Sequence, residues 1–74
     1  MMTLKSLLAE GRELLTTAQI ADADIDAWLL LQYVTGINRM MYLMEPDKSV
    51  SNEDTLAYHE VIARRATHYP LQYI

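Results

Sequence analysis

Leucines recur every three or four residues along the first part of the chain, and this spacing constrains the fold more than any other feature. At about 100° per residue, such positions lie on one side of a helical wheel. The positions on this side are Leu4, Leu7, Leu8, Gly11, Leu14, Leu15 and Ala18. We therefore expect an amphipathic helix from about Thr3, its N-cap, to about Ala18. Gly11 lies within the apolar stripe, which indicates either a close approach by another backbone or a tolerated glycine.

A second helix is expected over residues 21–36, and its character differs from that of the first. Between Ile25 and Val34 the apolar residues run nearly all the way round the helix. A helix of this kind is usually buried, so we expect it to be central. Gly36 can supply a left-handed stop. Three acids near its start can cap free N–H groups and face the positive end of the helix dipole; they are Asp22, Asp24 and Asp26.

Two further helices complete the expected bundle. Asn38 can cap a short helix over residues 39–44, and Ser51 can cap a longer one that Pro70 ends. The apolar stripe of the longer helix comprises Tyr58, Ile62, Ala66 and Tyr69. Methionines of the short helix, at positions 40, 41 and 44, fit either core filling or an adaptable partner surface. Since Pro70 can also open a fifth helix, we expect an all-α fold: a compact bundle of four to five short helices in a single domain, residues 1–74.

Composition excludes several classes of function. The chain has no cysteine, so it has no disulfide framework and no cysteine-based metal site. Ten acids against six bases give a net charge of −4, which argues against nonspecific nucleic-acid binding. The longest apolar run is too short to span a bilayer, and the N-terminus does not resemble a signal peptide. We therefore expect a cytoplasmic, monomeric protein that does not bind membranes.

Side chains suited to catalysis are scattered along the chain. His59 and His68 would lie on opposite sides of one helix, where they cannot ligate the same metal ion. No serine stands in a nucleophile elbow, and no glycine-rich phosphate loop is present. We expect no catalytic, metal-binding or cofactor-binding residue among these 74 residues.

Asp26 is the one acid set among apolar neighbours on the second helix. Its position between Leu29 and Leu30 on the wheel predicts burial, and a buried carboxylate is costly unless it is paired or hydrogen-bonded. Arg64 and Arg65 are the available guanidinium partners. We expect Asp26 to pair with Arg65 and so to dock the fourth helix against the second; the alternative is that Asp26 contacts a partner protein.

Two stretches resemble the release factor glutamine methyltransferase family (PrmC/HemK). The N-terminal helical domain of that family carries an Asp-Ala pattern followed by leucines on a central helix, matched by Asp26, Ala27, Leu29 and Leu30. It ends with an arginine, a short gap and a Pro-x-x-Tyr-Ile-Gly-type segment, matched by Arg65, Pro70, Gln72, Tyr73 and Ile74. His68 departs from the pattern, because the family often has glycine there.

The resemblance implies that residues 1–74 form the N-terminal substrate-recognition domain of a larger methyltransferase whose catalytic domain lies outside them. That catalytic domain would transfer a methyl group from S-adenosylmethionine to the glutamine of the Gly-Gly-Gln motif in class 1 peptide chain release factors. The 74 residues alone are then expected to be inactive and to bind no cofactor. Leu71, Tyr73 and Ile74 would contact the catalytic domain.

The family's helical domain also helps to bind the release factor, and the expected outer faces of the first, third and fourth helices are free for this. We expect Arg39, Met41, Arg64 and Arg65 to bind the partner, because arginine and methionine are enriched at interfaces. Alternatively, Arg65 pairs within the bundle and the methionines are buried. Two other functions stay open: the front domain of a ribosomal-protein glutamine methyltransferase, and a free-standing helical adaptor module.

Overall fold

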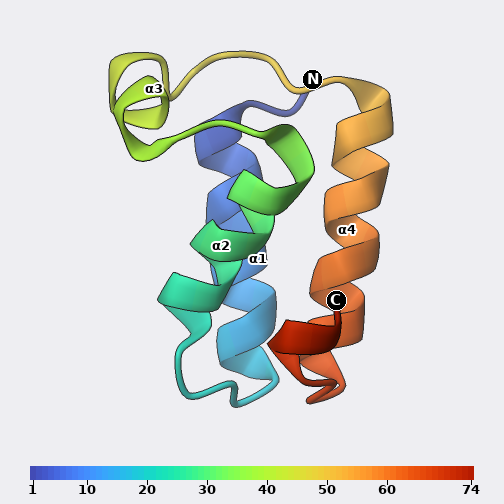
Figure 1. Ribbon diagram of the computed structural model, residues 1–74. Coiled ribbons are helices and arrows are strands. Elements are labelled where there is room, and N and C mark those ends of the chain that lie inside the picture. The colour runs from blue at the N-terminus through green and yellow to red at the C-terminus, as the bar shows by residue number, and fades with distance from the viewer.

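The computed structural model describes all 74 residues and contains four α-helices and one turn of 3-10 helix. The elements are α1 (Leu4–Thr17), α2 (Ala23–Thr35), α3 (Arg39–Met44), α4 (Asn52–Ala66) and η1 (Leu71–Tyr73). Helices α1, α2 and α4 pack against one another, while the short α3 lies apart at one end (Figure 1). The prediction of an all-α bundle of four to five helices is confirmed.

Short-range capping explains where three of the helices begin. A side-chain oxygen of the N-cap residue accepts a hydrogen bond from the backbone N–H three residues later, which satisfies a donor that the helix itself cannot. These bonds join Thr3 to Ser6 (3.1 Å), Asn38 to Met41 (2.8 Å) and Ser51 to Asp54 (3.1 Å). The prediction for α2 is wrong in one respect, because the side chain of its N-cap Asp22 makes no capping bond. Gly36 ends α2 with a φ of 75°, as expected.

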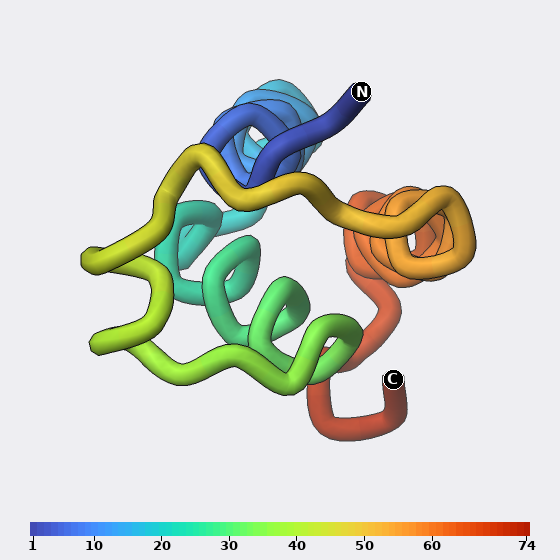
Figure 2. Tube along the Cα trace, turned by 90° about the horizontal axis from the view of Figure 1, so that it is seen from above, coloured from blue at the N-terminus to red at the C-terminus, as the bar shows by residue number.

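The segment between α3 and α4 returns to the start of α1. Backbone N–H groups of Leu4 and Lys5 donate to the carbonyls of Lys48 and Pro46, at 3.0 and 2.9 Å. Figure 2 shows this segment, in yellow, passing the blue N-terminal end of α1 on its way to α4. Two of the free N–H groups of α1 are therefore satisfied by a segment more than 40 residues away in the chain.

Tyr58 occupies the centre of the core, where α1, α2 and α4 meet. Its hydroxyl donates a 2.9 Å hydrogen bond to the carbonyl of Ala27 on α2. A Cβ added to Gly11 would lie only 2.9 Å from Tyr58 Cζ, so this glycine makes room for the ring. A close approach therefore explains Gly11, but a side chain makes it and not another backbone. Burial raises the pKa of Tyr58 above its ordinary value. The charge of Arg12 lowers this pKa and the charge of Glu10 raises it, but both effects are smaller than that of burial.

Helix α2 is not buried all the way round. Residues such as Ala27 and Leu31 are buried, but the prediction of a wholly central helix is wrong for the side formed by Ile25, Leu29 and Tyr33. These three are exposed because α1 and α4 cover only one side of α2. Leu14, expected on the apolar stripe of α1, is also exposed.

Candidate partner-binding surfaces

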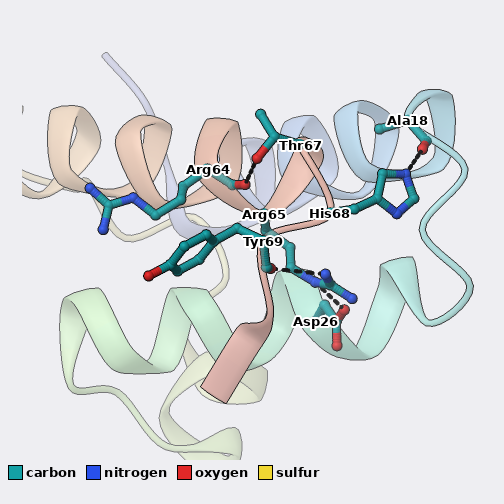
Figure 3. Close-up of polar contacts among 7 residues, drawn as sticks. All are labelled: Ala18, Asp26, Arg64, Arg65, Thr67, His68 and Tyr69. Carbon is teal, nitrogen blue, oxygen red and sulfur yellow. Dashed lines mark hydrogen bonds and ion pairs between the residues drawn. The ribbon is translucent and has the colours of Figure 1, made fainter. Parts of the chain in front are cut away.

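A hydrogen bond between two charged side chains holds the carboxyl end of α4 against α2. Arg65 Nε donates to Asp26 Oδ2 at 3.0 Å, and Arg65 Nη1 donates to the carbonyl of Tyr69, also at 3.0 Å (Figure 3). The side chains of Asp26 and Arg65 are 9% and 20% exposed, so water competes little for this contact. The structure thus contains the ion pair expected from the sequence, and Arg65 has little surface left for a partner.

A side-chain hydrogen bond joins the turn that follows α4 to the carboxyl end of α1. His68 has a φ of 67°, in the left-handed region that favours glycine, which agrees with the glycine that the resembled family often has there. Its Nε2 lies 2.9 Å from the carbonyl oxygen of Ala18 (Figure 3). A carbonyl can only accept, so Nε2 carries the proton in this contact.

Arg64 points away from the contact between Arg65 and Asp26 (Figure 3). Its Nη2 lies 3.8 Å from Glu60 Oε1, and its Cζ lies 5.8 Å from the ring centroid of Tyr69. Arg64 also lines a shallow hollow between α2 and α4, which Tyr33 and Ile74 share. An exposed arginine held this loosely is available to a partner.

Residues near the end of the chain differ in burial. Leu71 and Ile74 are half-buried and pack against the core of the bundle, whereas Tyr73 is exposed. Tyr73 contacts Tyr69 in an edge-on arrangement, with ring centroids 6.3 Å apart. Of the three residues expected to contact a further domain, only Tyr73 is therefore largely free.

Helix α3 buries none of its residues, although four of its six side chains are large and apolar. The exposed apolar residues are Met40, Met41, Leu43 and Met44. The interpretation of the methionines as core filler is therefore wrong, because α3 reaches the rest of the molecule mainly through Tyr42. The ring of Tyr42 stands edge-on to that of Trp28, with 5.5 Å between centroids. Met41 and Met44 also line an apolar hollow of about 150 Å³ beside α1.

Arg39 belongs to an aromatic cluster that sequence reasoning missed. Its Cζ lies 5.0 Å from the ring centroid of Trp28 and 5.7 Å from that of Tyr42, distances typical of cation–π contacts. Arg39 and Tyr42 are three residues apart on one helix, a spacing that places them on one face and could have revealed half of the cluster. Trp28 lies on α2, and no local signal connects it with α3.

The four residues expected to bind a partner do not form one surface. Arg39 and Met41 lie on α3, Arg64 and Arg65 lie on α4, and both views show α3 and α4 on different sides of α2 (Figures 1 and 2). Since Arg65 is bonded to Asp26, two separate candidate surfaces remain. One consists of the exposed residues of α3, and the other surrounds Arg64.

The structure contains no group of three or more histidine, cysteine or acidic side chains placed to hold a metal ion. His59 on α4 contacts Glu10 through a 2.6 Å approach of Nε2 to Oε1, whereas His68 lies in the turn after α4 and contacts Ala18. None of the helices combines the length and the apolar character needed to cross a membrane.

Comparison with known proteins finds one matching family, described as the PrmC N-terminal domain, over residues 6–74. Three similar curated proteins share the name release factor glutamine methyltransferase. That of Clostridium botulinum is 38% identical over 73 residues, which is 99% of this chain and 26% of the relative. Those of Nitratidesulfovibrio vulgaris and Deinococcus radiodurans are each 33% identical, over 97% and 99% of this chain and 24% and 26% of theirs. This chain thus spans about a quarter of the length of these relatives. No solved structure matches it significantly.

Proposed function

Because this chain belongs to the PrmC N-terminal domain family, we propose that it serves a release factor glutamine methyltransferase by helping to bind the release factor. Methyl transfer would fall to a further domain, corresponding to the part of the relatives that this chain does not span. S-adenosylmethionine would bind there and supply the methyl group for the glutamine of the Gly-Gly-Gln motif. Recognition is then the contribution of the 74 residues described here.

The observation that carries this proposal is the α3 surface, defined by Arg39, Met40, Met41, Leu43 and Met44. Single exposed apolar residues are ordinary, but a contiguous group of them marks an interaction site. Methionine side chains are flexible and polarizable, so they adapt to the shape of a partner. The N-cap Asn38 and the contact of Tyr42 with Trp28 hold this surface in place.

Two further parts of the proposal concern the surroundings of the domain. Tyr73 would contact the catalytic domain of the same protein through its exposed ring. Leu71 and Ile74, which are half-buried against the core, would border that contact. The protein would act in the cytoplasm, since its proposed partner is a factor of translation termination, and we propose that it does so as a monomer.

A titration with matched variants tests the proposal. The chain, labelled with nitrogen-15, is titrated with a purified class 1 release factor, and the dissociation constant is measured for wild type, Leu43→Gln and Leu56→Gln. Leu43 on α3 is 65% exposed and Leu56 on α4 is 69% exposed, so the two substitutions remove equally accessible side chains. Burying a leucine contributes about 1.5–3 kcal/mol, so we expect Leu43→Gln to weaken binding about tenfold or more and Leu56→Gln to have no effect. Absence of wild-type binding would contradict the proposed function, and equal effects of the two variants would contradict the α3 surface.

A further inference from the structure

A small hollow beside the α3 surface is lined by two arginines and one tryptophan. The hollow has a volume of about 230 Å³ and lies where α1, α2 and α3 converge. Its lining consists of Arg12, Asp24, Ile25, Trp28 and Arg39. We call it the two-arginine hollow. Three of its five lining residues are charged, whereas four of the six residues that line the hollow under Met41 are hydrophobic.

Arg39 is held in this hollow without an acidic partner. Its guanidinium lies over the rings of Trp28 and Tyr42, as described above. No carboxylate lies within ion-pairing distance of it, and it donates no hydrogen bond. The rings therefore position a cation whose N–H groups have no acceptor within the protein. A guanidinium in this state can donate two parallel hydrogen bonds to one carboxylate.

Arg12 is also incompletely satisfied. Its Nε atom is buried and has no hydrogen-bond acceptor. Asp24 Oδ1 is the nearest acid, but it lies 3.7 Å away on a side chain that is 80% exposed. An exposed pair at this distance is weak, so Asp24 does not satisfy the Arg12 guanidinium, which can still bind a better-placed acceptor.

The charges of the lining specify the kind of ligand. Two guanidiniums and one carboxylate leave the two-arginine hollow with a net charge of about +1, in a chain whose total charge is −4. One carboxylate balances this charge, whereas a doubly charged phosphate would exceed it. Ile25 and Trp28 provide an apolar wall against which the methylenes of a glutamate or aspartate side chain can pack.

We propose that the two-arginine hollow binds an acidic side chain of the partner protein, at the edge of the α3 surface. This proposal rests on the proposed function, and it names the chemistry by which the partner is recognised: an Asp or Glu side chain on a segment that also covers α3. Arg39 and Arg12 would share the carboxylate, with Arg39 positioned by the two rings. Because the contact is between charges near the surface, it contributes to orientation and association rate and weakens with added salt.

Trp28 provides a direct reporter, since it is the one tryptophan in the chain. The indole N–H signal of Trp28 is followed by NMR while the nitrogen-15-labelled chain is titrated with the release factor. Wild type is compared with Arg39→Gln and with Lys5→Gln, a control that removes an exposed cation of α1 that does not line the hollow. We expect the Trp28 signal to shift on binding, and the dissociation constant to rise at least tenfold for Arg39→Gln and less than twofold for Lys5→Gln. Well-dispersed spectra for both variants check that they are folded.

Two outcomes separate this inference from the proposed function. Binding of the release factor with an unmoved Trp28 signal, or with equal affinities for wild type and Arg39→Gln, would overturn the two-arginine hollow while leaving the proposed function intact. If wild type does not bind the release factor at all, a second titration decides. It uses the blocked peptide Gly-Glu-Leu-Glu-Gly and its Gln counterpart at millimolar concentration. A saturable shift of the Trp28 signal with the Glu peptide but not with the Gln peptide supports the carboxylate site. Either no shift or the same shift with both peptides overturns it.

Discussion

At the scale of single residues, Asp26 and Arg65 show how a motif shared with a family can be structural. Asp26 is buried in α2 beside apolar neighbours, and Arg65 reaches it from α4 while also bonding the carbonyl of Tyr69. One guanidinium therefore connects two helices and the turn that follows the second. A carboxylate in such surroundings needs this partner, because removing one member of a buried pair leaves the other uncompensated.

A double-mutant cycle tests the contribution of this pair. Asp26→Asn leaves Arg65 without a charged acceptor, and we expect a loss of about 1–3 kcal/mol in the free energy of unfolding. The coupling energy with Arg65→Gln should be at least about 0.5 kcal/mol. Urea denaturation followed by circular dichroism provides the four stabilities. The Glu60–Arg64 pair is the control: it spans 3.8 Å between exposed side chains, so its coupling should stay within a few tenths of a kcal/mol. Equal coupling in the two cycles would show that burial does not strengthen the Asp26–Arg65 contact.

At the scale of helices, much of the architecture could be predicted because its causes are local. Thr3, Asn38 and Ser51 mark helix starts since each cap bonds a backbone group three residues away. The covered side of α2 could not be predicted in this way. It depends on which neighbours are long enough to pack on it, and apolar residues occur on both of its sides.

The candidate surfaces were predictable only in part, for the same reason. Arg39, Met41 and Arg64 were identified by residue type, and all three are exposed. Their separation onto two surfaces follows from the placement of α3 relative to α4, which no short-range pattern specifies. Trp28 and Arg12 could not be identified in this way, because they line one hollow with Arg39 only through the placement of three helices in space.

A pair of leucines on α2 tests this division into two sides. Leu30 is 3% exposed and Leu29 is 42% exposed, although they are adjacent in the chain. Leu30→Ala removes buried methyl groups and leaves a cavity, so we expect it to lower the free energy of unfolding by about 2–5 kcal/mol. Leu29→Ala is the matched control and should cost less than about 1 kcal/mol. Similar losses for both variants, measured by thermal melting, would mean that α2 is covered on both sides in solution.

At the scale of the whole molecule, α1, α2 and α4 are joined at Tyr58. Its ring fills the space that Gly11 leaves in α1, and its hydroxyl bonds the backbone of α2 at Ala27. Burial raises the pKa of this hydroxyl above its ordinary value, which is about 10, so the fold favours the neutral form. The stability that this preference contributes is therefore fully present below about pH 10 and is lost as the pH rises toward the folded-state pKa.

The dependence of stability on alkaline pH tests this role. Raising the pH from about 9 to about 11.5 should lower the melting temperature of wild type, because the unfolded chain releases the Tyr58 proton more readily than the folded chain does. Tyr58→Phe loses a hydrogen bond and should be less stable near pH 7 by about 0.5–1.5 kcal/mol. Its melting temperature should nevertheless fall less steeply with pH, since it has no buried hydroxyl to ionise. Tyr33→Phe removes an exposed hydroxyl from α2, and its melting temperature should fall with pH as steeply as that of wild type. This control separates the effect of Tyr58 from the ionisation of the other tyrosines and the lysines. If Tyr58→Phe and wild type lose stability in parallel, the three helices are not joined through a neutral, buried Tyr58.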